Sequence, residues 1–211
     1  MKEKIFIRIL ISLIAGLIVL FIEYEYLIPG FDLQSILSKF NETKQQLTTL
    51  RSTPAIIMEN DAQSMLVEKG FYSSYWNQHG AGLPNYYEVL AGGKVILDRS
   101  SGLMWQQSGT PETMTYEEAE KYIAQHNRDK YAGYKYWRLP TLDEAMSLTK
   151  PVKYTSLFIA PDFDENQIYI WTVDRKSAAE AWSVDFNIGD CYASRRDAQF
   201  FVRAVRIADN P

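Results

Sequence analysis

Two short polar segments carry the side chains best suited to binding an ion or a charged ligand. Asp162, Asp164 and Asn166 alternate along the chain, so their oxygens could approach one Ca²⁺. The segment lacks the glycine and the distal glutamate of an EF-hand loop, which favours an exposed acidic loop. Arg195 and Arg196 are adjacent and could meet an anionic ligand, or form only a solvated turn. We take these five as the candidate ligand-binding residues and predict no metal and no cofactor.

Catalytic chemistry has little support in the sequence. His79 and His126 lie in ordinary polar surroundings, with no serine–histidine–aspartate pattern around them. Cys191 is the only cysteine, which excludes an internal disulfide, a cysteine-pair metal site and a redox pair. The chain also has no Gly-x-Ser-x-Gly motif, phosphate-binding loop or His-x-x-x-His motif. We therefore predict that the protein is not an enzyme.

The composition limits the class of partner. Hydrophobic residues make up 46% of the 211 residues and aromatic residues 14%, enough to build a core. The formal net charge is −4, whereas proteins that bind nucleic acids usually present a basic face. We therefore predict no nucleic-acid partner and expect a protein or an anionic glycan instead.

The N-terminal apolar run predicts a membrane anchor. Ile9–Ile22 carries no charge, and the run lengthens if Arg8 extends toward the lipid headgroups. Lys2, Lys4 and Arg8 precede the run, and Glu23 and Glu25 follow it. We predict one transmembrane helix within residues 1–28, in contact with lipid of the inner (cytoplasmic) membrane. The N-terminus would be cytoplasmic and the rest periplasmic or extracytoplasmic; a cleaved signal peptide is the alternative.

Residues 29–69 are predicted to be a helical spacer. Apolar residues recur at helical spacing in its first part: Leu33, Ile36, Phe40, Leu47 and Leu50. This stripe fits an amphipathic helix on its own domain, or an oligomer or complex formed through residues 1–51. A second short helix is expected over Asp61–Lys69, ending at Gly70.

Residues 70–211 are predicted to form an α+β domain. Two helices are expected, one capped by Thr113 or Thr115 and ending near Asn127, the other capped by Thr141 with Glu144 three residues on. The expected strands are Tyr86–Leu90, Lys94–Asp98, Leu103–Gln106, Ile168–Thr172, Ala181–Phe186 and Gln199–Ile207. Residues 155–167 and 187–198 are expected to be loops that carry the function.

Three blocks are rich in tryptophan, arginine and aliphatic residues: Gly102–Gln106, Tyr136–Thr141 and Phe201–Arg206. With the helix start at Tyr116–Ala119, they resemble the Lcl C-terminal domain family over about Lys94–Ile207. The resemblance implies a C-type-lectin-like fold, with two helices packed on short antiparallel strands joined by long loops. It also implies a distant similarity to formylglycine-generating enzymes and a family association with sulfated polysaccharides. This chain has no collagen repeat, and Ala204 stands where many members carry cysteine.

The four tryptophans of the domain are expected in the core rather than at a sugar-stacking surface: Trp105, Trp137, Trp171 and Trp182. Arg138, Arg203 and Arg206 are expected to pair with carboxylates or carbonyls inside the protein. The favoured function is a membrane-anchored, non-catalytic binding module that recognises a protein or a glycan. The alternative is an accessory or structural subunit of a larger inner-membrane complex.

Overall fold

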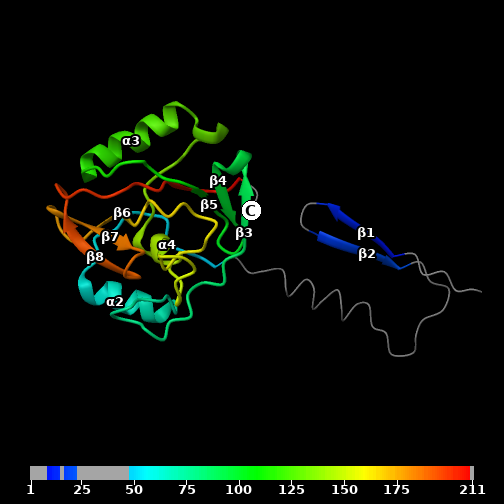
Figure 1. Ribbon diagram of the computed structural model, residues 1–211, viewed down its shortest axis with the longest axis horizontal. Coiled ribbons are helices and arrows are strands. Elements are labelled where there is room, and N and C mark those ends of the chain that lie inside the picture. The colour runs from blue at the N-terminus through cyan, green and yellow to red at the C-terminus, as the bar shows by residue number, and fades with distance from the viewer. Residues whose placement is uncertain (1–8, 15–16, 23–47, 210–211) are drawn as a thin grey trace, which may run out of the picture. The chain divides into compact units, whose positions relative to one another are not determined.

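The computed structural model describes residues 9–14, 17–22 and 48–209 (Figure 1). The chain divides into two compact units, Met1–Gln45 and Gln46–Pro211. The second unit contains every helix of the described residues and two of the three sheets. It has few helices and two antiparallel sheets, which confirms the predicted α+β class.

The apolar N-terminal run differs from its prediction. Ile9–Ile14 (β1) and Leu17–Ile22 (β2) are antiparallel strands, with Ile14 opposite Leu17, where we predicted a helix. Within the described ranges, no helix has the length and apolar character needed to cross a membrane. A uniformly apolar run rich in isoleucine and leucine has no polar–apolar period that would separate a helix from a strand. The other residues of the predicted anchor, and the helical stripe up to Leu47, lie outside the described residues.

One sheet of the larger unit has four antiparallel strands in the order β3-β4-β5-β9. They are Tyr87–Leu90 (β3), Val95–Asp98 (β4), Leu103–Gln106 (β5) and Val205–Ile207 (β9). A 3-10 turn at Ala91–Gly93 (η1) joins β3 to β4, as the glycine pair predicted. The end of the chain therefore returns to the strand that bears Trp105, which pairs with Val205.

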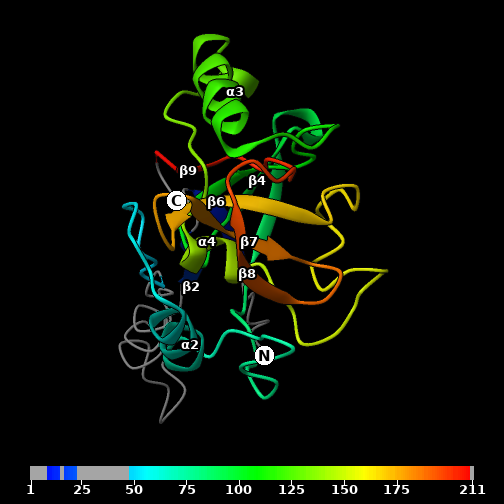
Figure 2. The same cartoon turned by 90° about the vertical axis from the view of Figure 1, so that its left-hand side faces the viewer.

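The second sheet is a meander of three antiparallel strands (Figure 2). They are Tyr169–Arg175 (β6), Glu180–Asp185 (β7) and Asp190–Arg195 (β8). The prediction of a loop over 187–198 is wrong for half of its length, because 190–195 pairs with β7 residue by residue. Of the predicted strand at 199–207, only Val205–Ile207 (β9) pairs with a neighbouring strand of a sheet. Its earlier part bridges between elements, with Phe200 paired to Met114 and Phe201 to Ile170.

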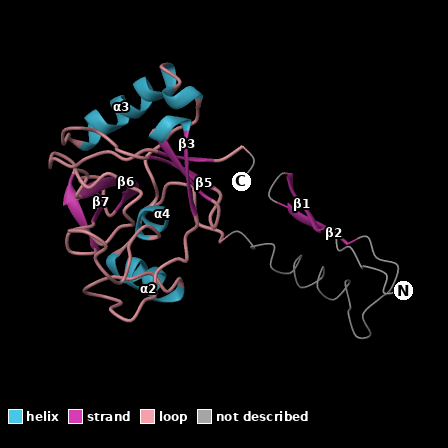
Figure 3. Cartoon of the chain, turned by 45° about the vertical axis from the view of Figure 1, so that its right-hand side comes forward, coloured by secondary structure: helices cyan, strands magenta, loops and turns pink. Residues whose placement is uncertain are grey.

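Among the described residues, three α-helices accompany the sheets. They are Glu59–Glu68 (α2), Tyr116–Arg128 (α3) and Leu142–Met146 (α4). Capping boxes at Thr115 and Thr141 confirm two predicted helix starts. α2 and α3 lie at opposite ends of the unit with the sheets between them, and long loops join the elements (Figures 2 and 3).

The four tryptophans lie in the core as predicted, each at most 2% exposed. Three of their indole N–H groups donate to backbone carbonyls, for example Trp182 to Ile57 at 3.0 Å and Trp171 to Met114 at 2.9 Å. Such bonds satisfy the one polar atom of a buried indole. Arg138 donates both terminal nitrogens to Glu144 at 2.6 Å, the fork-like pair that was expected.

The segment from Thr48 to Lys69, which is part of the predicted spacer, packs with this unit. Ile57, Ala62 and Leu66 belong to the main core cluster. Arg51 donates to Asp174 at 2.8 and 2.6 Å, and Asp174 also accepts the backbone N–H of Ala55 at 2.8 Å. An ion pair between two residues that are far apart in the sequence therefore holds this segment against the sheet.

Candidate functional site

The acidic loop at 162–166 is anchored through its backbone. Gln107 donates to the Asp162 carbonyl at 3.0 Å, and Arg203 donates to the Asp164 carbonyl at 2.8 Å. The Asp164 carboxylate accepts the backbone N–H of Asn166 at 2.8 Å, which closes a local turn. In the part of the chain that the structure describes, no cluster of three or more His, Cys, Asp or Glu side chains could hold a metal.

The two candidate arginines have partners within the chain. Arg195 is exposed and donates to both oxygens of Asp197, at 2.9 and 2.6 Å. Arg196 lies over the Tyr116 ring, 4.7 Å from its centroid, and its Nη2 is 3.7 Å from a Glu120 oxygen. They lie at and just after the end of β8, on elements separate from the acidic loop. The structure therefore does not gather the five predicted residues into one site.

A different hollow combines cations with aromatic rings. It has a volume of about 490 Å³ and lies between the end of α3 and two 3-10 turns, η1 and Tyr131–Gly133 (η2). We call it the α3–η2 pocket. Its lining residues are Ala91, Lys94, His126, Asp129, Lys130, Tyr131, Ala132 and Gly133. Such a volume lies within the range of small-ligand sites in proteins.

The inner wall of this pocket is a stack of rings. His126 lies parallel to Tyr131 with centroids 4.0 Å apart, and its other neighbours are Tyr122 at 4.9 Å and Trp137 at 5.9 Å. His126 is only 7% exposed, and its Nε2 has no hydrogen-bond partner among the described residues. Burial lowers the pKa of His126 to about 4, so the ring is neutral at physiological pH.

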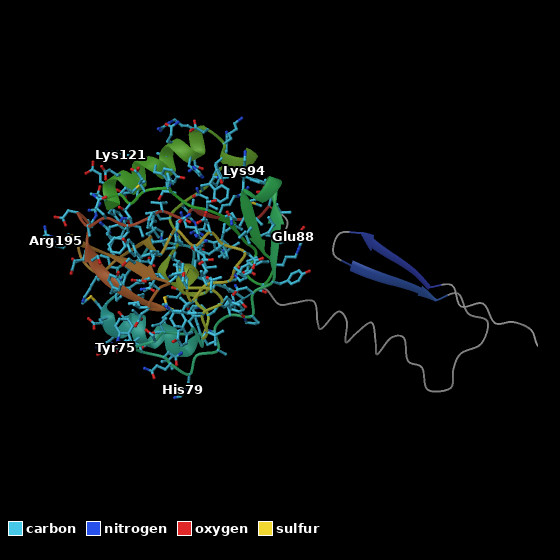
Figure 4. The ribbon with its side chains drawn as sticks, in the orientation of Figure 1. Tyr75, His79, Glu88, Lys94, Lys121 and Arg195 are labelled. Carbon is cyan, nitrogen blue, oxygen red and sulfur yellow. The ribbon has the colours of Figure 1, made fainter. Side chains whose placement is uncertain are left out.

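Two lysines provide the charge at the rim. Lys94 and Lys130 are exposed, and neither ammonium bonds or pairs with any described residue. Asp129 is the one carboxylate of the lining, and it already accepts the Gln125 side-chain amide at 2.7 Å. Two ammonium groups and one carboxylate leave the lining with an excess of positive charge, beside a neutral aromatic wall. Figure 4 shows that Lys94 and Arg195 lie at different edges of the domain.

Backbone strain is concentrated at the same place. Ala91, Lys130, Ala132 and Tyr136 have φ of 51°, 49°, 52° and 66°, and no other non-glycine residue of the described ranges has positive φ. Three of them line the pocket. The left-handed conformation costs a residue with a Cβ about 1–2 kcal/mol. Residues in such conformations cluster at ligand sites, where the surrounding structure enforces them.

The side chain of Asn127 enforces this geometry. Its amide donates to the Trp137 carbonyl at 2.8 Å and accepts the Trp137 N–H at 2.8 Å, which closes the loop 128–136. The same amide donates to the Ile123 carbonyl at 3.1 Å and so ties the loop to α3. Sequence reasoning considered His126 only as a catalytic residue and missed both lysines. The sequence did contain one signal for this pocket, the run Lys130-Tyr131-Ala132-Gly133 after the end of a helix.

The residues of the pocket have side chains that could bind a sugar carrying negative groups. Aromatic faces stack on the apolar face of a sugar ring, and lysines attract sulfate or carboxylate groups. Trp137 and Tyr134 support the stack from behind, 6.5 Å apart and edge to face, and Arg206 lies 4.9 Å from the Tyr134 centroid. The charged and aromatic groups are thus held on a buried framework.

Comparison with known proteins identifies the framework. The model of the Lcl C-terminal domain matches residues 94–206, from the start of β4 into β9. The match includes most of the α3–η2 pocket but leaves α2 and β3 outside. No curated protein matches the chain at a significant level. Because the match covers more than half of the 211 residues, the chain belongs to the Lcl C-terminal domain family.

Proposed function

We propose that the protein is a non-catalytic binding module whose α3–η2 pocket binds an anionic glycan. One observation carries the proposal: Lys94 and Lys130, without partners among the described residues, flank the stacked rings of Tyr131 and His126. The membership in the family supports a binding role of this general kind.

The physics of the site indicates the type of affinity to expect. Exposed ion pairs contribute only about 0.2–1 kcal/mol each, and salt screens them over about 10 Å at 0.1 M. One pocket would therefore hold a charged sugar weakly, and a polymer would bind better because it offers many repeats. The rigid aromatic wall adds contact at little entropic cost, since its rings are already stacked.

We propose that residues 70–211 form a C-type-lectin-like domain with a distant relation to formylglycine-generating enzymes. Its support is the combination of α3 and α4 with short antiparallel strands and long loops (Figure 3). Shared architecture does not transfer an enzymatic activity, because chemistry resides in particular side chains.

The test is binding of the full chain to heparin and to uncharged dextran. Lys94→Ala and Lys130→Ala should each weaken heparin binding by about two- to fivefold, and the double variant should lose more. Lys121→Ala is the matched control, because Lys121 lies on α3 but is paired with Glu117 at 2.8 Å (Figure 4). Equal losses in all three single variants, or no binding to heparin, would remove the proposed site.

A second candidate function, an accessory subunit of a membrane complex, rests on a different surface. Ile56, Met58, Val67 and Tyr75 are apolar or aromatic residues in or near α2 that are more than half exposed. They lie outside the stretch that the family model matches. If this surface contacts a protein, Met58→Ser with Val67→Ser should abolish co-purification of a partner while heparin binding persists.

We also propose that the apolar N-terminal run associates with the inner membrane and leaves the domain outside the cytoplasm. The support is the sequence itself, with Lys2, Lys4 and Arg8 before the run and Glu23 and Glu25 after it. Protease added to spheroplasts should then digest the domain. Complete protection of the domain in intact spheroplasts would contradict this placement.

A further inference from the structure

A second hollow lies away from the α3–η2 pocket. It has a volume of about 550 Å³ and is lined by residues from the segments 81–87, 150–154 and 160–162. Among its lining residues are Asn85, Tyr87, Lys150, Tyr154 and Asp162. We call it the Lys150 pocket. The proposed glycan function does not use it.

Lys150 is unusual because it is a buried cation. It is 9% exposed, and its ammonium donates to the Leu83 carbonyl at 2.9 Å and to the Asn85 side-chain oxygen. The Asn85 amide in turn donates to the Asp98 carboxylate at 2.7 Å, so Lys150 is joined to the buried Asp98 through one amide. An ammonium has three N–H groups, and these two bonds leave one for a ligand.

Asp162 supplies an acceptor that the protein leaves unused. Its side chain is half-buried and lines the same hollow, yet it accepts no hydrogen bond and forms no ion pair within the described part of the chain. It is close enough to Lys150 to raise the pKa of that lysine, against the larger lowering by burial. A cation with a spare N–H and an unpaired carboxylate therefore line one pocket without meeting each other.

Positive charge also lies behind the wall of the pocket. Arg203 is fully buried, with its guanidinium 4.7 Å from the Phe163 centroid, and Phe163 meets the Tyr87 ring edge to face at 5.2 Å. Two nitrogens of Arg203, Nε and Nη1, have no hydrogen-bond partner among the described residues. Lys150 lies 5.7 Å from the Tyr87 centroid, and Arg203 contacts the Phe163 ring that packs on Tyr87, so two cations make this side of the pocket attractive to an anionic group.

We propose that the Lys150 pocket binds a small zwitterion, a free α-amino acid. Its carboxylate would accept from the Lys150 ammonium, and its ammonium would donate to the Asp162 carboxylate. The ring of Tyr154 and the apolar Ala160 and Pro161 would contact its side chain. Each charged group then gains a partner of opposite charge in a partly dry site, which favours a ligand with both charges over one with a single charge.

The test uses thermal unfolding and titration calorimetry of the full chain. The probes are one small, one acidic, one basic and one aromatic L-amino acid, each at about 10 mM, with acetate and methylammonium as the two half-ligands. At least one amino acid should bind and raise the midpoint of unfolding, and neither half-ligand should do so. Lys150→Gln and Asp162→Asn should each weaken binding at least about tenfold.

Asp164→Asn is the matched control, because Asp164 is the neighbouring acidic residue but does not line the pocket. It should leave binding unchanged. Failure of all four amino acids to bind, equal loss in Asp164→Asn, or equal binding of acetate would overturn the proposal. Asp162→Asn keeps the test valid if Lys150→Gln does not fold. The heparin variants Lys94→Ala and Lys130→Ala should retain amino-acid binding, so the two proposals fail independently.

Discussion

His126 makes the stability of the domain depend on acid in a way that can be calculated. Burial lowers its pKa from 6.5 in the unfolded chain to about 4 in the folded one. Between these values the unfolded state binds more protons, so the free energy of unfolding falls as the pH drops from 7 toward 4. The shift predicts a loss of about 2.5 kcal/mol at roughly pH 4.5.

The cause is the surroundings of the ring. The imidazolium would be held between Tyr122, Tyr131 and Trp137, with Asp129 as the one charge that favours it. Stacked rings exclude the water that would solvate the charged form. The neutral state is also the one in which His126 forms an uncharged wall of the α3–η2 pocket.

The assay is urea unfolding of the wild type and His126→Phe at neutral pH and at about pH 4.5. Phenylalanine keeps the ring but cannot bind a proton, so the variant should lose about 2 kcal/mol less stability on acidification. His79→Gln is the control, since His79 is exposed and should change nothing. If wild type and His126→Phe lose the same free energy, His126 is not held neutral by burial and the reasoning fails.

Three further changes test the framework. Asp174→Ala should lower the free energy of unfolding by about 3–5 kcal/mol in urea, because it removes a fully buried carboxylate that accepts four hydrogen bonds. Asp197→Ala, at an exposed ion pair, should lower it by under about 1 kcal/mol. Ala132→Gly should raise the midpoint of unfolding or leave it unchanged, since glycine relieves the strain at φ 52°, and a clear loss would contradict that strain. Gly109→Ala should destabilise the domain by about 2 kcal/mol or more in the same assay, because its Cβ would lie 2.6 Å from the Val202 carbonyl oxygen; a neutral effect would refute the close packing.

Elements with local signals could be predicted from the sequence. Thr141 and Glu144 lie three residues apart, and their capping box depends on nothing outside one helical turn. The burial of the tryptophans was predictable because side chains so large and apolar are favoured in a protein core. β8 was missed because Asp190–Arg195 does not alternate between polar and apolar residues, and its place in the sheet comes from the partner strand β7 rather than from its own pattern.

The candidate site could not be predicted in the same way. Lys94 and Lys130 are far apart in the chain, and α3 and the turn η2 bring them to one hollow. Arg195 and Arg196, which the sequence favoured as ligand-binding residues, form ion pairs with Asp197 and Glu120 in the folded chain. Pairing between charges depends on separations of a few ångströms, which the order of residues does not contain.

The sequence by itself determined the family, the α+β class and the starts of two helices, since these depend on residue types in short contiguous blocks. It also excluded cysteine-pair chemistry by composition alone. The tertiary structure decided which charges are left unpaired, which rings stack and where the backbone is strained. These properties arise when residues distant in the chain compete for the same partners, and only packing determines the outcome.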